Sequence, residues 1–432
     1  MNVILKIVDM TDDGRGIGKT EENFTVFVDS CLPGDTVEAE IYKRKKNFAE
    51  ANLVKIISYS EDRIENKCET PSDCGGCDFM EYSYPAQLAL KERKVRNMLS
   101  RISSIDADIN DIKHGESSYN YRNKAVLHVD EDSIGYYSKK SNDTVNMINC
   151  LINSRVSVEI KKFLVELMKK YKIRDIENIL IRNSKRDEEI MVVFISPKEK
   201  IKNIDKITEE LVNKFPNIKS VMLNVNKNNR FLLGRKSEVL YGRNYIVDYI
   251  KDMKFKISPE TFFQVNADVT EIMYDTVLKY ADLKENDTVF DIYSGIGTIS
   301  LFLAQKAEKV IGIEYVQKSV ENAAENAEIN GIDNTEFIAG KAEEILPKFD
   351  KKGTKADVIV VDPPRKGCDR NVLSAMINMN PRTIVYVSCN PATFARDLGY
   401  LADNGYEVKR VQPLDMFSHT THVENVALIE RV

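Results

Sequence analysis

Two residues near the carboxyl end of the chain have side chains that can carry out covalent chemistry. Cys389 follows Thr383–Val387, an apolar run that predicts a strand buried on both faces of a parallel sheet. Ligands of such sheets bind at the carboxyl ends of the strands, where this thiol would lie. Glu424 precedes the last apolar run and can act as a general base. We therefore predict that Cys389 is a nucleophile and that Glu424 is its partner base.

A pyrimidine ring is a substrate that suits this pair. Carbon 5 of the ring is a poor nucleophile until a thiolate adds to carbon 6, after which carbon 5 can attack a methyl sulfonium. A base must then remove the carbon-5 proton before the thiol can leave. Cys368 is the other cysteine of this region, but it lies several residues beyond the end of its strand. His419, His422 and Glu424 are residue types that can also serve as metal ligands, but no further ligand pattern surrounds them, so a metal site is not predicted here.

A glycine-rich loop indicates a site for a nucleoside-containing cofactor. Asp291–Leu301 ends a predicted strand and opens a helix, and glycines such as Gly295 allow a sharp turn and the close approach of a ligand. Ser300 stands where dinucleotide-binding loops have their third glycine. Glu314 ends the next strand, where an acidic residue suits the two hydroxyls of a ribose. Asp362, followed by two prolines, ends a later strand, and this order resembles class I S-adenosylmethionine methyltransferases.

Four further cysteines form a candidate metal site. Cys68, Cys74 and Cys77 are separated by gaps of five and two residues, and Cys150 is the candidate for a fourth ligand. Four thiolates suit either a tetrahedral zinc ion or an iron–sulfur cluster, and the residue types leave both open. The spacing differs from the C-x3-C-x2-C pattern of radical S-adenosylmethionine enzymes. Cys31 adjoins a turn and is interpreted as a packing residue.

Taken together, these motifs resemble the RNA (uracil-5-)-methyltransferase family, specifically the bacterial members that modify uridines in 23S ribosomal RNA. The motifs that carry the resemblance are Phe262–Asn266, Asp291–Leu301, Ile313-Glu314, Asp362–Gly367, Ser388–Pro391 and Glu424-Asn425. The resemblance implies that Cys389 is the nucleophile and Glu424 the base. It also implies five contacts to S-adenosylmethionine: Gln264, Tyr293, Gly295, Glu314 and Asp362. Thr298 stands where some members have Asn and is therefore left out.

The same resemblance bears on the metal and on the amino-terminal part of the chain. Members with this cysteine spacing carry a [4Fe-4S] cluster, so the resemblance favours that cluster at Cys68, Cys74, Cys77 and Cys150. With four ligands no iron is open, which favours a structural or RNA-positioning role. The amino-terminal part is similar to a TRAM domain, and the match then covers essentially the whole chain.

An α/β fold is needed to bring these residues together. Apolar runs that alternate with helical segments predict a Rossmann-like class I methyltransferase domain over residues 256–432. Short strands with tight turns predict a small OB-type barrel over 1–57, with the basic run 43–46 either on RNA phosphate or at a solvated hairpin tip. Residues 58–255 are predicted to form a mixed α+β domain for RNA and the iron–sulfur cluster, and a helix over 85–102 is expected to pack on the catalytic domain.

Composition excludes several classes of protein. The net charge of −5 excludes a uniformly basic nucleic-acid coat, though not a local basic groove. No apolar run approaches the ~20 residues that span a bilayer, and Met1–Asp13 does not read as a signal peptide. We therefore expect a cytoplasmic monomer whose seven cysteines serve metal binding or catalysis rather than disulfides.

Three alternatives to methylation of ribosomal RNA remain. The same chemistry could act on transfer RNA, although the barrel and the cysteine set favour ribosomal RNA because the transfer RNA enzymes of the family typically lack both. A radical methylthiotransferase also combines a TRAM-like domain with a cluster, but the cysteine spacing and the Rossmann-like part argue against it. An RNA chaperone would leave Cys389 and Glu424 without a role.

Overall fold

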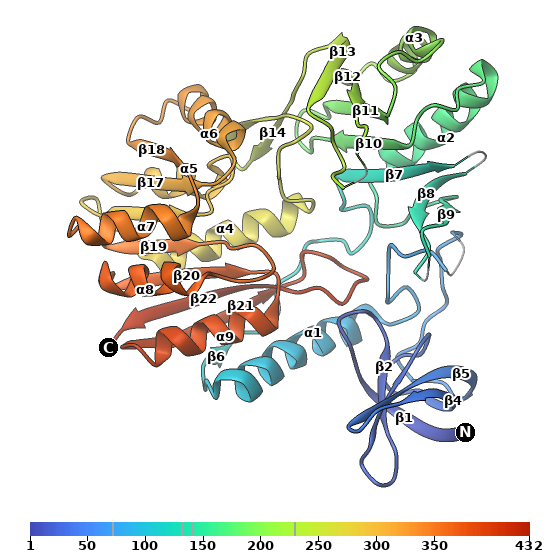
Figure 1. Cartoon of the computed structure of the whole chain (residues 1–432), viewed down its shortest axis with the longest axis horizontal. Coiled ribbons are helices and arrows are strands. Elements are labelled where there is room, and N and C mark those ends of the chain that lie inside the picture. Colours follow the sequence, from blue (N-terminus) through green and yellow to red (C-terminus); the bar gives the residue numbers. More distant parts are fainter. Residues whose placement is uncertain (71–72, 131–132, 140, 229) are drawn as a thin grey trace.

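The computed structural model describes residues 1–70, 73–130, 133–139, 141–228 and 230–432. The described chain forms a closed barrel, a seven-stranded sheet, a two-stranded hairpin and an eight-stranded sheet. Figure 1 shows the barrel (blue) and the seven-stranded sheet (green) on one side of the molecule and the eight-stranded sheet with its helices (orange and red) on the other. None of the helices in these ranges is long and apolar enough to cross a membrane.

The barrel closes in the strand order β1-β2-β3-β5-β4. Its strands are β1 Asn2–Met10, β2 Gly16–Lys19, β3 Thr25–Val28, β4 Thr36–Arg44 and β5 Phe48–Ser58. Alternate side chains such as Leu5, Ile7 and Val37 fill the interior, as expected for a pleated strand with one buried face. The predicted five-stranded barrel is therefore confirmed.

One part of the barrel is formed by a glycine-rich stretch, residues 13–18. Its second half forms β2, which pairs with both β1 and β3. A Cβ at Gly16 would lie 2.5 Å from Sγ of the buried Cys31, so only glycine lets the strand pass this close to that thiol. Cys31 is thus a packing residue at this point of the barrel.

The basic run 43–46 lies at the tip of the β4–β5 hairpin. Lys43 Nζ is 3.1 Å from a carboxylate oxygen of Glu50, and the guanidinium of Arg44 lies 4.8 Å from the centre of the Phe24 ring. Intramolecular partners therefore already engage part of this positive charge.

The seven-stranded sheet has the order β13-β12-β11-β10-β7-β8-β9. Its strands are β7 Lys124–Asp130, β8 Ser133–Tyr137, β9 Thr144–Asn146, β10 Asn178–Asn183, β11 Ile190–Ser196, β12 Ile218–Val225 and β13 Lys236–Gly242. The apolar faces of α2 (Arg155–Tyr171) and α3 (Ile204–Lys214) pack on one side of it. The opposite face packs on the hairpin β14 (Ile246–Ile250) and β15 (Met253–Ile257), and through it on the catalytic part of the chain.

The eight-stranded sheet has the order β18-β17-β16-β19-β20-β22-β21-β6. The five strands β18, β17, β16, β19 and β20 run parallel to one another, while β22 is antiparallel to both of its neighbours, β20 and β21. The strands are β6 Asp108–Ile109, β16 Thr288–Ile292, β17 Lys309–Glu314, β18 Thr335–Ala339, β19 Val358–Val361, β20 Thr383–Ser388, β21 Tyr406–Leu414 and β22 Glu424–Arg431. β16, β17, β19 and β20 are apolar runs that alternate with helices, as predicted from the sequence, which confirms the α/β class.

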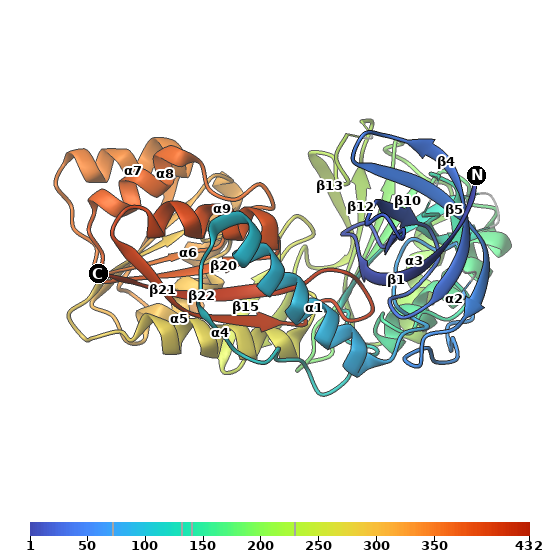
Figure 2. The ribbon, with the colours of Figure 1, turned by 90° about the horizontal axis from the view of Figure 1, so that it is seen from below.

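Helices cover both faces of this sheet, as Figure 2 shows. One face packs on α4 (Ala267–Ala281), α5 (Thr298–Ala304) and α6 (Gln317–Ile329), and the other packs on α7 (Ala342–Lys351), α8 (Arg370–Asn378) and α9 (Pro391–Ala402). Successive residues of one strand therefore enter opposite cores: Val289 faces the first group of helices and Phe290 the second. Burial on both faces explains why these strands are apolar without alternation.

A long helix connects the barrel side of the molecule to the catalytic sheet. α1 (Tyr84–Met98) continues as a π-helix, η1 (Leu99–Ser103), and lies along α9 in Figures 1 and 2. Val95 and Leu99 enter the same apolar core as Phe394 of α9. The chain then adds β6 to the free edge of β21, where Ile109 pairs with Val411. The eight-stranded sheet is thus completed by residues that lie far upstream of 256.

Candidate active site

The carboxyl end of β16 leads into the glycine-rich loop. Tyr293, Gly295 and Gly297 all have positive φ (68°, 56° and 80°), so the chain turns sharply before α5 begins at Thr298. A Cβ at Gly297 would lie 2.9 Å from the Phe337 ring, whereas a Cβ at Gly295 would meet no atom within 4 Å. Gly297 thus allows tight packing, while the backbone at Gly295 faces open space that a ligand can approach.

Four of the five predicted cofactor contacts line one small cavity at this loop. Gln264, Tyr293, Gly295 and Asp362 surround a volume of about 40 Å³. The fifth, Glu314, lies beside it: its carboxylate accepts hydrogen bonds from the backbone N–H groups of Gly295 (3.1 Å) and Val316 (2.8 Å). The structure therefore brings all five residues to the carboxyl edge of β16, β17 and β19.

Three further residues line this cavity, and none of them has a role predicted from the sequence: Phe262, Tyr274 and Asp291. Tyr274 on α4 donates a hydrogen bond from its hydroxyl to Oγ1 of Thr298 (2.7 Å). Phe262 lines the same cavity and is 70% exposed, unlike its buried neighbour Phe263. An exposed aromatic side chain beside a cofactor cavity can stack on a base, and the doubled Phe-Phe in the sequence was the signal for it.

Asp291 is the third additional feature of the cavity. Its side chain is 1% exposed. One carboxylate oxygen accepts a hydrogen bond from Oγ of Ser300 (2.5 Å), and the other has no hydrogen-bond partner among the described residues. Burial, with the nearby charges of Asp362 and Glu314, raises the pKa of Asp291 to about 7. This loop therefore holds a polar oxygen that a donor on a bound ligand could satisfy.

Cys389 lies at the carboxyl end of β20, directly before α9. The side chain of Asn390 caps α9 by accepting a hydrogen bond from the N–H of Ala392 (3.0 Å), which orients the chain just after the thiol. Cys389 itself is half-buried. Burial, followed by the charges of Glu424 and Asp362, raises the pKa of its thiol to about 11, while the cation of Arg365 acts in the opposite direction.

Glu424 is the first residue of β22, the strand next to β20. Because Asn425 pairs with Ser388, the β-ladder brings Glu424 to the level of Cys389. Glu424 is 3% exposed. Burial and then the charge of Asp362 raise the pKa of Glu424 well above its ordinary value, and Arg365 again opposes this. A thiol and a carboxyl that can take up a proton thus lie together beside the cofactor cavity.

The loops that surround Cys389 are held together by hydrogen bonds. The carbonyl of Arg365, which follows the two prolines after β19, accepts hydrogen bonds from Nδ2 of Asn390 (3.1 Å) and Oγ1 of Thr393 (3.1 Å). The guanidinium of Arg365 also lies 3.4 Å from Nε2 of His422. Arg365 is exposed at the rim of the site, where a substrate phosphate or base can reach it.

Cys368, the other cysteine of this region, lies in the apolar core rather than in the site. It is 6% exposed, and its thiol accepts a hydrogen bond from the Tyr386 hydroxyl (3.5 Å). Burial raises its pKa to about 12. A buried, protonated thiol is a poor nucleophile.

The four other cysteines share one cavity between the barrel and the seven-stranded sheet. Cys68, Cys74, Cys77 and Cys150 all line this cavity of about 440 Å³. Within the described ranges, no three His, Cys, Asp or Glu side chains are arranged to hold a metal ion, which covers His419 and His422 with Glu424 as well. Residues 71 and 72, within the cysteine segment, lie outside the described residues.

Comparison with solved structures identifies the class. The chain aligns over 99% of its length with all of the Pyrococcus abyssi tRNA (uracil-54, carbon 5) methyltransferase, solved in complex with S-adenosyl-L-homocysteine, at a TM-score of 0.79 and 27% sequence identity. The protein is an S-adenosylmethionine-dependent methyltransferase.

Comparison with sequence families makes the assignment narrower. Residues 83–432 match the family model of tRNA (Uracil-5-)-methyltransferase, and residues 3–54 match the TRAM domain. Proteins named as uncharacterized RNA methyltransferases are 42% identical in Clostridium tetani and 43% in Oceanobacillus iheyensis, each over 98% of this chain and 95% of the relative. The chain belongs to the tRNA (uracil-5-)-methyltransferase family and carries an amino-terminal TRAM domain. It is therefore an RNA (uracil-5-)-methyltransferase.

Proposed function

We propose that this enzyme, acting as a monomer, methylates carbon 5 of a uridine in 23S ribosomal RNA through a covalent bond between Cys389 and carbon 6 of the ring. One observation carries the mechanism: β20 and β22 bring the Cys389 thiol and the buried Glu424 carboxyl together beside the cofactor cavity. Neither Cys368, in the core, nor His419, buried within the loop between β21 and β22, has this placement.

Each proton and electron pair of the reaction can be followed. Cys389 loses its proton to solvent, and its thiolate adds to carbon 6, which moves an electron pair through carbon 5 onto the carbonyl oxygen. Bound S-adenosylmethionine would supply an electrophilic methyl group to carbon 5, and its sulfur would leave as the neutral thioether of S-adenosylhomocysteine. Glu424 then takes the carbon-5 proton, and the electron pair of that bond re-forms the ring double bond as the Cys389 sulfur leaves carbon 6. The raised pKa of Glu424 makes its carboxylate a stronger base than an exposed glutamate.

Five residues are proposed to hold S-adenosylmethionine: Gln264, Tyr293, Gly295, Glu314 and Asp362. Their fit to a nucleoside rests on two features of the loop. The backbone at Gly295 faces open space, and the buried hydroxyl of Ser294 and one oxygen of Asp291 lack hydrogen-bond partners among the described residues. Glu314 presents its carboxylate beside Gly295, where it can accept from the two ribose hydroxyls.

We also propose that Cys68, Cys74, Cys77 and Cys150 hold a [4Fe-4S] cluster. The support is the donor set and its placement, since the four thiols line one cavity. Burial, followed by the charges of the other three sulfurs, raises the pKa of Cys77. A bound cation would favour the thiolate form that binds metal. Four thiolates also suit a zinc ion. The cluster is preferred because the cysteine spacing resembles that of family members that carry a [4Fe-4S] cluster.

The choice of RNA depends on the cysteine set more than on the barrel. The match to a tRNA-modifying enzyme extends over 99% of this chain, barrel included, so a barrel alone does not separate the two substrates. The expectation that transfer RNA enzymes of the family lack the barrel is therefore wrong for this relative. Transfer RNA uridine is therefore the second candidate, favoured by that same match, while membership of the family removes the radical methylthiotransferase alternative.

Two experiments test the proposal. Glu424→Gln should still form the thioether and transfer the methyl group, but should release product about 10²–10⁴-fold more slowly, the usual effect of a lost general base. A methylated protein–RNA species should then survive a denaturing gel, and Cys389→Ala/Glu424→Gln should form none. For the substrate, 5-methyluridine should be mapped in 23S ribosomal RNA and transfer RNA from cells with and without the gene. Loss confined to transfer RNA would refute the 23S assignment.

A further inference from the structure

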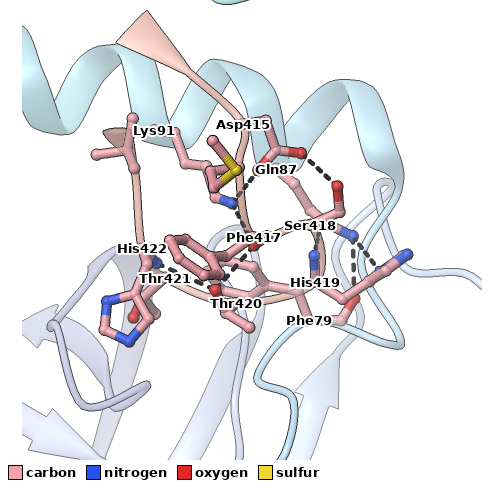
Figure 3. Close-up of polar contacts among 12 residues, drawn as sticks. Phe79, Gln87, Lys91, Asp415, Phe417, Ser418, His419, Thr420, Thr421 and His422 are labelled. Atoms are coloured by element: carbon pink, nitrogen blue, oxygen red, sulfur yellow. Dashed lines mark hydrogen bonds and ion pairs between the residues drawn. The ribbon is translucent and has the colours of Figure 1, made fainter. Parts of the chain in front are cut away.

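The loop that leads into Glu424 is unusually polar and unusually buried. This β21–β22 loop, residues 415–423, connects the last two long strands of the catalytic sheet. Asp415, Ser418 and His419 are each 1% exposed. Loops usually lie on the surface because buried backbone groups need partners. The partners of this loop come from segments far upstream in the sequence, as Figure 3 shows.

The first partner is Gln87 on α1, which has no exposed surface. Its Oε1 accepts a hydrogen bond from the backbone N–H of His419 (3.1 Å), and its Nε2 lies 3.1 Å from Nδ1 of the same residue. Nε2 also donates to the carbonyls of Phe79 (3.1 Å) and Tyr82 (2.8 Å). One amide therefore joins α1, the β21–β22 loop and the segment that follows the cysteines (Figure 3).

The second partner is the cysteine segment itself. The backbone N–H groups of Asp78 and Phe79, directly after Cys77, both donate to the carbonyl of His419 (2.8 and 3.1 Å). The carboxylate of Asp78 accepts from the N–H of Thr421 (3.2 Å). Thr421 also donates from Oγ1 to the carbonyl of Asp12 in the barrel (2.7 Å). The barrel, the cysteine segment and the catalytic sheet thus meet at this one loop.

The backbone of His419 indicates that these contacts hold the loop in a conformation that it would not adopt alone. Its φ is 65°, in the left-handed region that non-glycine residues rarely occupy. Its ring is stacked on Tyr119 at 4.7 Å between centroids. Such conformations persist where the surrounding structure determines them, and they cluster at functional sites.

We infer that Gln87 and Asp78 are positioning residues for Glu424: through His419 and Thr421 they fix the β21–β22 loop, and with it the place of the base. The inference rests on the proposed role of Glu424. Because Asp78 directly follows Cys77 in the chain, the cysteine segment would help to position the base without contacting the substrate. The step that depends on this positioning is removal of the carbon-5 proton, not addition of Cys389 or methyl transfer.

Gln87→Leu and Asp78→Ala test the inference. Both variants should bind S-adenosylmethionine and transfer the methyl group normally, but should release the protein–RNA adduct more slowly, by about 10- to 100-fold for Gln87→Leu, since a displacement of about 1 Å can cost 10²-fold. Hydrogen exchange of residues 415–423 should become faster. Asp78→Asn is the matched control, because it removes the same charge but keeps an acceptor for Thr421, and it should restore release.

A double variant separates positioning from a general loss of stability. If Gln87 acts through Glu424, Gln87→Leu/Glu424→Gln should release its adduct no more slowly than Glu424→Gln. Additive slowing would overturn the inference, as would wild-type release by both single variants while Glu424→Gln traps the adduct. An equal loss of cofactor binding, methyl transfer and release would also overturn it. If Glu424→Gln traps nothing, the proposed base is wrong, and this result is distinct from the others.

Discussion

Replacing Lys91 with methionine removes one partner of an ion pair that is buried below the β21–β22 loop. Nζ of Lys91 lies 2.5 Å from Oδ1 of Asp415, and the two side chains are 1% and 0% exposed. The same ammonium donates to the carbonyl of Phe417 (3.0 Å). In Lys91→Met the carboxylate keeps, among the described residues, two side-chain donors, the hydroxyls of Tyr84 (2.6 Å) and Ser418 (2.8 Å).

Loss of one partner of a buried pair costs about 3–5 kcal/mol, because the other charge remains in a site of low polarity. The two hydroxyls that remain on Asp415 offset part of this, so we expect a loss near the lower end, about 3 kcal/mol. Burial alone raises the pKa of Asp415, but the charge of Lys91 and hydrogen bonds from Lys91, Tyr84 and Ser418 bring it below its ordinary value. The stabilisation is therefore present at neutral pH and is lost as the pH falls through that lowered pKa.

Urea titration monitored by circular dichroism would measure the free energy of unfolding of Lys91→Met at neutral pH and near pH 4. The deficit should be smaller near pH 4, because without Lys91 burial raises the pKa of Asp415 and the carboxyl of the variant takes up a proton. Lys318→Met is the matched control: its partner Glu321 is 3.2 Å away, but the side chains are 59% and 48% exposed, so the loss should stay below about 1 kcal/mol. Lys91→Met/Asp415→Asn leaves no unpaired charge and should be more stable than Lys91→Met. A deficit equal to the control, or a double variant less stable than the single, would refute this reasoning.

Four other outcomes are expected. Cys389→Ala should abolish methylation while calorimetry shows nearly unchanged S-adenosylmethionine binding, and a large loss of binding would contradict its placement. With the pKa of the Cys389 thiol at about 11, adduct formation should rise about tenfold per pH unit from about pH 6 to 8, since the thiolate is the nucleophile; a flat profile argues for another proton acceptor. Neutralising Lys43–Lys46 should weaken RNA binding and flatten its salt dependence, and an unaltered slope makes the run a solvated tip. Anaerobically purified protein should contain about four irons and lose them in Cys150→Ala; stoichiometric zinc would oppose this.

The parts of the fold that the sequence predicts are those with a local physical signature. β16, β17, β19 and β20 are buried on both faces, so each is an unbroken apolar run, and α2 has an apolar stripe along one side. The glycine loop and the acidic residues at strand ends are likewise local in the chain. For that reason the cofactor candidates, Cys389 and Glu424 could all be named before their neighbours were known.

Other features depend on partners that the chain supplies from far away. β2 forms on a stretch rich in glycine because β1 and β3 flank it, and β6 is too short to have a pattern of its own without β21. The polar residues of the β21–β22 loop are typical of an exposed loop. No neighbouring residue in the sequence indicates that Gln87 and Asp78 bury this loop. Burial of Cys368 beside Tyr386 is similarly a result of packing between α8, α9 and the sheet.

The strand β6 is synthesised long before β21, the strand with which it pairs. Asn110, just after β6, bonds to Gln412, which is 302 residues further along the chain. At roughly 5–20 residues per second, a ribosome needs roughly 15–60 s to cover that distance. Throughout this interval β6 and the apolar side of α1 have left the ribosome, but β21 and α9 do not yet exist. The nascent chain therefore carries a helix whose buried face, which includes Val95, lacks its catalytic-domain partners until the last segment is made, and this face is a surface that a chaperone can bind.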